Sequence, residues 1–354
     1  MGAVHLRGQT VETLAAAFPG LPLAVARRVL HRVVGEDRGD LRGVRGLSKA
    51  LASELEARGR LDRLEVVDRR RSAVDPFVKY LFRSTDGRLF EAVRIPLERP
   101  RFSVCLSSQV GCALGCRFCE TGRLGFARNL EPWEMVEQAL TVRRESPERP
   151  VTGAVFQGQG EPFLNYDNVI RAAGVLRDPS GPRIGSDRIS ISTVGLLPQI
   201  DRYTEEGHPY RLILSLTSAF SEKRERLVPL TSRHGVPDLA RAMRRHASAR
   251  KGPVHLAWVL ISGFNTGRQE ARELALLFRG VPVRLSVIDV NDPTGRFVRA
   301  DDDERGRFLS ALAEHGLGFV RRYSGGPDID AACGMLASHA RGGEIHEPSV
   351  GAPS

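Results

Sequence analysis

The chain has 354 residues, of which 41% are hydrophobic and 27% charged. This composition is typical of a globular protein and excludes a disordered chain, and the length predicts one large domain with a small companion. No apolar run reaches the roughly 18 residues that cross a bilayer, and residues 1–10 lack the apolar core of a secretory signal. We therefore expect a cytoplasmic protein with no membrane partner.

Basic residues outnumber acidic ones by 10, and the sequence pI is about 9.9. Such a balance indicates a polyanionic partner, most commonly nucleic acid. Residues 1–100 carry 19 basic and 13 acidic side chains, so the amino-terminal part is the more basic. The run of arginines over 69–71 has two interpretations there, a solvated face or linker and a contact with RNA.

The first hundred residues show helical patterns followed by a hairpin. Apolar residues at helical spacing predict three helices, over 10–18, 23–34 and 48–58. These helices would form an RNA-binding accessory domain over residues 1–75. Strands over 77–83 and 89–95, separated by a turn, predict a β-hairpin connector at 76–100.

From about residue 101, short apolar strands alternate with helical stretches. Strands are predicted over 102–106, 153–158, 188–193, 211–217, 254–261 and 283–289. Helices are predicted over 132–145, 165–177, 197–206, 237–250, 267–278 and 302–315, with a last strand over 318–323. Six β-then-α units predict a parallel sheet with right-handed crossovers, and six are too few for a closed eight-stranded barrel. We therefore expect an α/β fold, a partial (β/α)6 barrel over 101–340, with a flexible tail at 341–354.

Three of the five cysteines crowd together as Cys112-x3-Cys116-x2-Cys119, directly after the first strand of the expected barrel. Cys105 and Cys333 stand apart from them. An odd number of cysteines argues against a disulfide framework and for metal or catalytic chemistry. Three thiolates at this spacing can hold one side of an iron–sulfur cluster and leave one iron open. The alternatives are incidental cysteines and a structural zinc site, the latter in a non-catalytic, zinc-stabilised RNA-binding module.

Candidate ligand-binding residues, several of them small or polar, lie at the carboxyl ends of other expected strands, where barrels of this kind bind ligands. They are Gly160, Glu161, Ser192, Ser215, Leu216-Thr217 and Asn291. Glycine permits close backbone approach, and the Glu161 carboxylate can accept hydrogen bonds from an amine or a ribose. Each residue alone is more typical of a turn or a cap. Together they surround the rim that carries the three cysteines.

The cysteine spacing, with Phe118 inside it, resembles the radical S-adenosylmethionine (radical SAM) superfamily. A narrower resemblance covers about residues 20–340. The segment from Cys105 to Cys119, Cys-Leu-Ser-Ser-Gln-Val-Gly-Cys-Ala-Leu-Gly-Cys-Arg-Phe-Cys, resembles the RlmN/Cfr family of radical SAM RNA adenine methyltransferases. The segments 158–162, 192–195 and 328–334 match that family as well.

The resemblance implies a [4Fe-4S] cluster on Cys112, Cys116 and Cys119, and two SAM molecules per turnover bound at the strand-end residues. It implies methylation of an adenosine ring carbon, usually C2, in 23S rRNA and in some members in tRNA. An external electron donor such as flavodoxin would reduce the cluster, and the oligomeric state is left open. The family scheme is matched by three further residues: Cys333 carries the methyl group, Cys105 releases the product through a disulfide with Cys333, and Glu91 is the general base. From its hairpin position alone, Glu91 is equally a solvated carboxylate.

Several residues depart from the family pattern. Thr217 stands where members commonly carry histidine, and Asp289 replaces a proline before the asparagine of the sixth strand. Gln157 and Gln159 replace hydrophobic residues. These departures leave an alternative open, a divergent paralogue that methylates C8, another RNA or a peptide.

Overall fold

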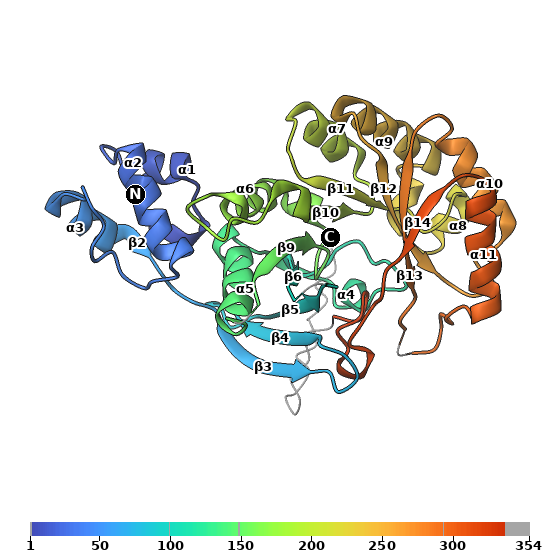
Figure 1. Cartoon of the computed structure of the whole chain (residues 1–354), viewed down its shortest axis with the longest axis horizontal. Coiled ribbons are helices and arrows are strands. Elements are labelled where there is room, and N and C mark those ends of the chain that lie inside the picture. The colour runs from blue at the N-terminus through green and yellow to red at the C-terminus, as the bar shows by residue number, and fades with distance from the viewer. Residues whose placement is uncertain (1, 99, 148, 293, 337–354) are drawn as a thin grey trace, which may run out of the picture.

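A ten-stranded sheet forms the centre of the molecule (Figure 1). The computed structural model describes residues 2–98, 100–147, 149–292 and 294–336. The strands of the sheet in chain order are β3 (Glu65–Arg71), β4 (Val78–Arg83), β5 (Leu89–Pro96), β6 (Phe102–Leu106), β9 (Val151–Phe156), β10 (Ile189–Thr193), β11 (Arg211–Ser215), β12 (Val254–Leu260), β13 (Val283–Asp289) and β14 (Gly318–Arg321). The predicted tail at 341–354 lies outside the described residues.

The sheet has a parallel part and an antiparallel extension. From β6 through β9 to β14 each strand pairs in parallel with the next, whereas β3, β4, β5 and β6 pair antiparallel. Helices follow the parallel strands as α5 (Pro132–Arg144), α6 (Tyr166–Arg177), α7 (Leu197–Glu205), α9 (Val236–Arg250), α10 (Arg268–Leu277) and α11 (Asp302–Glu314). The predicted partial barrel with a hairpin extension is therefore confirmed.

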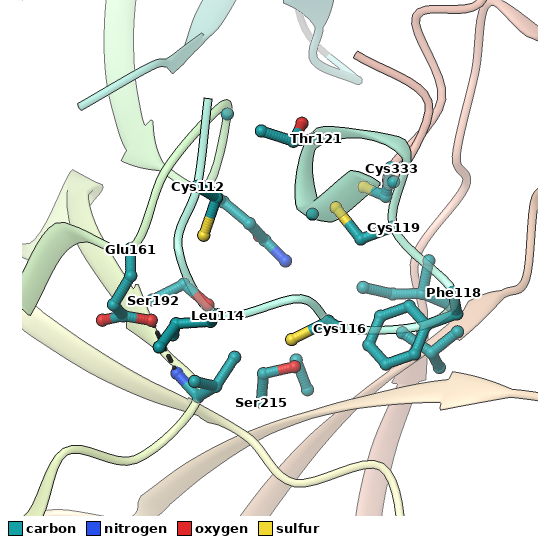
Figure 2. A pocket seen from close by; sticks show the side chains of 18 of the residues that line it. Cys112, Leu114, Cys116, Phe118, Cys119, Thr121, Glu161, Ser192, Ser215 and Cys333 are labelled. Carbon is teal, nitrogen blue, oxygen red and sulfur yellow. Dashed lines mark hydrogen bonds between the residues drawn. The ribbon is translucent and has the colours of Figure 1, made fainter. Parts of the chain in front are cut away.

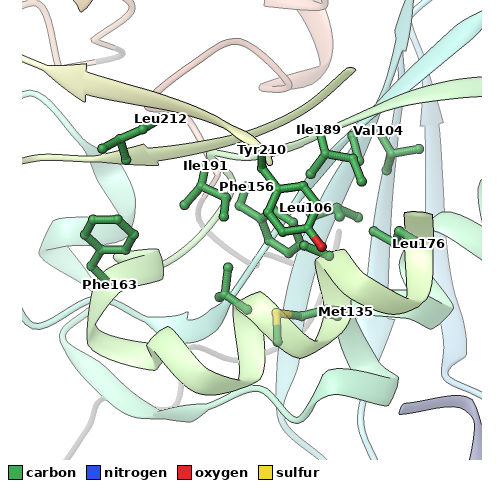
Figure 3. Packing of buried hydrophobic residues seen from close by; sticks show 14 of the residues in the cluster. Val104, Leu106, Met135, Phe156, Phe163, Leu176, Ile189, Ile191, Tyr210 and Leu212 are labelled. Atoms are coloured by element: carbon green, nitrogen blue, oxygen red, sulfur yellow. The ribbon is translucent and has the colours of Figure 1, made fainter. Parts of the chain in front are cut away.

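The core lies between the parallel strands and these helices. Leu106, Phe156 and Ile191 on the strands pack against side chains of α5 and α6, such as Met135 and Leu176 (Figure 3). Such strands are covered by helices and read as nearly continuous apolar runs, which is why the sequence pattern located them. Local signals mark several of the helix starts. The helices α5 and α11 begin at side-chain caps, such as the Asp301 side chain that accepts the backbone N–H of Glu304, and α7 and α9 have a proline in the first turn.

The amino-terminal region is helical as predicted, with α1 (Val11–Ala17), α2 (Leu23–Leu30) and α3 (Lys49–Arg58). The helix predicted over 23–34 continues past α2 as a π-helical turn at His31–Gly35. The short strands β1 (Val4–His5) and β2 (Gly59–Arg60) pair in parallel. Arg7 is completely buried and forms an ion pair with Glu137 of α5 at 3.0 Å, which fastens this region to the barrel.

Four further short helices and strands were not predicted: β7 (Gln109–Gly111), α4 (Glu120–Arg123), β8 (Phe126–Asn129) and α8 (Ser221–Glu225). The arginine run over 69–71 is part of the edge strand β3, so the linker interpretation is wrong. Arg69 pairs with Glu145 at 2.6 Å, and Arg70 Nη1 lies 3.7 Å from Asp330. No helix among the described residues is long and apolar enough to span a bilayer.

Candidate active site

The loop over residues 112–119, which we call the cluster loop, follows β6 and β7 at the carboxyl ends of the parallel strands. Gly111 precedes it with a φ of +74°, and a side chain there would collide with the carbonyl oxygen of Gly125. The backbone N–H of Cys112 donates to that same oxygen at 2.7 Å. Glycine is therefore required to bring β7 and β8 together and to aim the loop at the strand ends.

The three cysteines of the cluster loop line one cavity (Figure 2). The same wall holds five of the residues predicted at strand ends and the separate cysteine, namely Gly160, Glu161, Ser192, Ser215, Asn291 and Cys333. The fold thus brings together residues that are up to about two hundred positions apart in the sequence. In Figure 2 the sulfur atoms of the cluster loop stand around an open space.

The chemistry of these thiols fits an iron–sulfur cluster. Burial raises the pKa of Cys112 to about 11 and raises the pKa values of Cys116 and Cys119 as well. Buried thiolates need a positive partner, which iron supplies. Among the described residues, no group of three His, Cys, Asp or Glu side chains converges closely enough to hold a single metal ion.

Glu161 lies beside the cluster loop and is 3% exposed. Its Oε1 accepts the backbone N–H of Phe163 and its Oε2 that of Val194, both at 3.0 Å. Burial raises its pKa to about 7. Gly160 has a φ of +94°, and a side chain there would collide with Gln109. These two residues form a rigid turn whose carboxylate can accept a hydrogen bond from a cationic amine.

Leu216 and Thr217 are not on the cavity wall, contrary to our prediction from the sequence. The predicted strand 211–217 ends at Ser215, and both following side chains are completely buried. Thr217 has a φ of +64°, and its carbonyl accepts a hydrogen bond from Asn265 at 2.6 Å. The turn directs the chain into the helical layer because apolar packing is available there.

Arg224 is a buried residue of this site that the sequence did not indicate. Its guanidinium lies beneath the cavity floor and donates to the carbonyls of Leu216 at 2.9 Å and Ser215 at 3.1 Å, and to that of Val194. Burial lowers its pKa to about 10. It ties the ends of β10 and β11 together, a role that no local motif in the sequence signals.

Cys105 and Cys333 share the wall of a second, smaller cavity, which adjoins the first along Cys119, Gln157 and Gly158. Cys105 is buried on β6, and its pKa is raised to about 12 by burial and by the neighbouring Cys333. All five cysteines are free thiols, so the predicted disulfide is not formed in this structure. The fold nevertheless brings the two thiols together.

Cys333 lies on the segment over residues 322–334, which we call the Cys333 loop. Its backbone N–H donates to Ser324 Oγ at 2.8 Å, and its side chain packs on Ile213, Ala257 and Ile288 of the barrel. The carbonyl of Gly334 accepts the N–H of Glu120 at 2.7 Å, which joins this loop to the end of the cluster loop.

Glu91 is buried rather than solvated, with 1% of its surface exposed. It does not line either cavity, so the structure does not bring its carboxylate to the wall that holds the cysteines. Instead, Lys79 Nζ lies 3.2 Å from Glu91 Oε1 and donates to the carbonyl of Asp330, also at 3.2 Å. The pair therefore connects the hairpin to the Cys333 loop.

Comparison with known proteins agrees with this geometry. The model of the Radical SAM superfamily matches residues 106–275. A crystal structure of a radical SAM methyltransferase from Sphaerobacter thermophilus superposes with a TM-score of 0.86 at 36% identity, covering 95% of this chain and all of that one.

Relatives of similar length extend the match over almost the whole chain. A probable RNA methyltransferase of Anaeromyxobacter sp. (strain Fw109-5) is 49% identical, over 96% of this chain and 100% of its own. The same organism has a dual-specificity RNA methyltransferase RlmN that is 36% identical, over 96% of this chain and 91% of its own. These matches identify an enzyme and exclude the zinc-stabilised binding module.

Proposed function

The chain belongs to the RlmN/Cfr family of radical SAM RNA methyltransferases, and we propose that it methylates C2 of an adenosine in 23S rRNA, with tRNA as a further substrate. The observation that supports this proposal is that Cys105 and Cys333 line one cavity, which adjoins the cavity of the three cysteines of the cluster loop. An sp2 carbon of a purine ring is too weak a nucleophile for simple polar methyl transfer. Two additional thiols next to a radical-generating site can overcome this, because one can carry the methyl carbon and the other can release the product.

Cys112, Cys116 and Cys119 would hold the [4Fe-4S] cluster through three irons, and Gly160, Glu161, Ser192, Ser215 and Asn291 would hold SAM. When bound, the cluster and SAM together supply a methyl group and a carbon-centred radical, and one SAM molecule is used for each. Glu161 would accept a hydrogen bond from the methionyl ammonium, and its buried position keeps water from competing for that contact. A flavodoxin-like donor would supply the electron.

Cys333 would carry the methyl carbon, because it is the more exposed of the two thiols and lies on both cavities. That carbon bonds to the ring carbon in place of its hydrogen, which leaves as a proton, and the cluster would take up the electron released. The Cys105 thiolate then attacks the sulfur of Cys333. The S–S bond forms as the S–C bond breaks, and the electron pair goes to the carbon, which takes a proton to become methyl. A dithiol reductant then restores both thiols. Glu91 acts with Lys79 by holding the Cys333 loop in place.

Replacement of the resolving thiol tests the two-cysteine scheme. Cys105→Ala should stop the reaction before product release and leave RNA covalently bound to Cys333, detectable as a protein–RNA adduct by denaturing electrophoresis and mass spectrometry. The matched control is Cys105→Ala/Cys333→Ala, which should form no adduct. Normal turnover by Cys105→Ala would refute the scheme.

The substrate is tested by mass spectrometry of nucleosides from digested rRNA and tRNA. A strain lacking the protein should lose 2-methyladenosine from 23S rRNA, and re-expression should restore it. An unchanged 2-methyladenosine level would refute the assignment of C2 in these RNAs.

A divergent paralogue is the second candidate, and one observation favours it. One Anaeromyxobacter strain has both an RlmN protein and a second probable RNA methyltransferase, and our chain is 36% identical to the former and 49% to the latter. A paralogue of this kind would methylate C8 of adenosine, another RNA or a peptide. Loss of 8-methyladenosine rather than 2-methyladenosine in the same digests would identify the first of these.

A further inference from the structure

Five arginines and one histidine line a hollow on the concave face of the sheet, at the end away from the cluster loop. They are Arg101, Arg188, Arg211, Arg284, Arg322 and His255, and we call this region the arginine hollow. Its volume is about 750 Å³, within the range of about 300–1,000 Å³ that is common for ligand sites. Arg211 and Arg284 are exposed at its mouth.

The sheet register explains why these side chains gather. Arg211 begins β11, and its neighbour Ile213 pairs with His255 on β12, which pairs in turn with Arg284 on β13. Because side chains alternate along a strand, Arg211 and Ile213 share a face. The basic residues therefore stand side by side at the amino ends of three adjacent parallel strands.

The positive charge of the hollow is only partly neutralised, because five arginines line it against three acidic residues. None of its five arginines forms an ion pair with another residue that the structure describes, whereas Arg202 on the outer surface pairs with both Asp167 and Glu206. Three acidic residues also line the hollow, namely Asp75, Glu98 and Asp187. Of these, Asp75 is occupied by hydrogen bonds from Tyr323 and Gly326. Burial, with a smaller contribution from Arg211 and Arg284, lowers the pKa of His255 to about 4.

The hollow leads to the two reactive thiols. It shares Phe77, Ile95, Arg322 and Tyr323 with the cavity that holds Cys105 and Cys333. Arg322 donates to Gln157 Oε1 at 2.8 Å, and Gln157 lines the cysteine cavities. A ligand whose charged part occupies the hollow can therefore extend a neutral part to the thiols.

We propose that the arginine hollow binds backbone phosphates flanking the target nucleotide of the RNA, so that the base reaches Cys105 and Cys333 from the amino ends of the barrel strands. Guanidinium groups form paired hydrogen bonds with phosphate oxygens, and unpaired arginines are the ones available for this contact. This inference rests on the proposed RNA methylation, since it assigns the path by which that substrate enters.

The test measures RNA binding as a function of salt for Arg211→Gln/Arg284→Gln. With an unmodified 23S rRNA transcript and, separately, a tRNA transcript, the dissociation constant should rise about tenfold for each arginine removed. The slope of log affinity against log salt should become shallower by about 0.7–0.9 for each phosphate that the variant no longer binds. The matched control is Arg171→Gln/Arg272→Gln on the outer helices, which removes the same charge and should change affinity less than twofold. Bound iron should be equal in both variants and in the wild-type protein.

Two outcomes would overturn the proposal. One is wild-type affinity and salt slope in Arg211→Gln/Arg284→Gln. The other is unchanged RNA binding with loss of flavodoxin-driven turnover that dithionite restores, which would assign the hollow to an acidic redox partner. Failure of the proposed function is separate: wild-type protein would then bind the transcripts without methylating them, while the binding measurements would still test the hollow.

Discussion

The two loops that supply sulfur atoms to the active site are held in different ways. The cluster loop is fixed mainly by nearby backbone contacts, such as the Cys119 N–H to the Cys116 carbonyl at 3.1 Å. The Cys333 loop is held by side chains from the other end of the chain. Asp328 accepts from Ser72 Oγ at 2.7 Å and from the N–H of Ala73 at 2.8 Å, across 256 and 255 residues.

Asp75 makes a second contact of this kind, accepting from Tyr323 Oη at 2.9 Å and from the N–H of Gly326 at 2.8 Å. The antiparallel extension therefore positions the thiol that would carry the methyl group, while the barrel positions the cluster. The two loops therefore differ in how far along the sequence their supporting contacts lie, and the extension supplies those of the Cys333 loop.

Removal of one thiol from the cluster loop should have the largest effect. Cys116→Ala leaves two cysteine ligands, too few to hold the cluster, so bound iron and methylation should both fall to background. Iron and sulfide analysis after anaerobic reconstitution measures this directly. Cys333→Ala is the matched control, which should lose methylation but keep its iron. Full iron content in Cys116→Ala would contradict the assignment of the cluster ligands.

The two remaining thiols should differ in reactivity. The pKa of Cys105 is raised from 9.0 to about 12, so at pH 8 its thiolate fraction is about a thousandfold below that of an ordinary cysteine. In a Cys112→Ala/Cys116→Ala/Cys119→Ala protein, iodoacetamide should therefore label Cys333 long before Cys105. Raising the pH should increase Cys105 labelling about tenfold per unit. Peptide mass spectrometry follows both sites, and equal labelling rates at pH 8 would contradict the prediction.

The buried ion pair of Lys79 and Glu91, which contacts the Cys333 loop, should contribute to the free energy of unfolding. Lys79→Met removes the ammonium group that lies 3.2 Å from the buried Glu91 carboxylate, which should lower the free energy of unfolding by about 3–5 kcal/mol. Lys79→Met/Glu91→Gln removes the charge as well and should recover most of that loss, as measured by denaturant titration. No recovery in the double variant would show that the pair is not coupled.

Sequence patterns located the barrel well because its strands are apolar and several of its helices begin with a capping side chain or a proline. They missed β3, since Glu65–Arg71 is charged and lies at the sheet edge, where no apolar alternation is needed. They extended the fourth barrel strand past Ser215 because Leu216 continues the apolar run, although the chain turns away there.

The same division holds within the site. The cluster loop could be predicted from the spacing of its cysteines, because one short segment provides all three thiols. The contacts of Asp75 and Asp328 could not be predicted from the sequence. Each joins segments about 250 residues apart, and aspartate is common in ordinary turns. Glu91 was likewise assigned from resemblance alone, and its burial against Lys79 became visible only in the fold.

Asp328→Asn should have the smallest effect and tests the positioning role most sharply. The amide keeps the shape of the carboxylate but loses its charge and one acceptor, so the Cys333 loop should lose its strongest tie to Ser72 and Ala73. Asp328 is exposed, so water competes for its hydrogen bonds, and methylation should fall by only about two- to fivefold. Bound iron and RNA affinity should stay unchanged, because neither depends on this contact. Asp303→Asn, an exposed residue on α11, is the control for removal of a surface charge. An equal loss of RNA affinity in Asp328→Asn would instead place Asp328 in the RNA interface, and the two loops would then differ in what they bind rather than in how they are held.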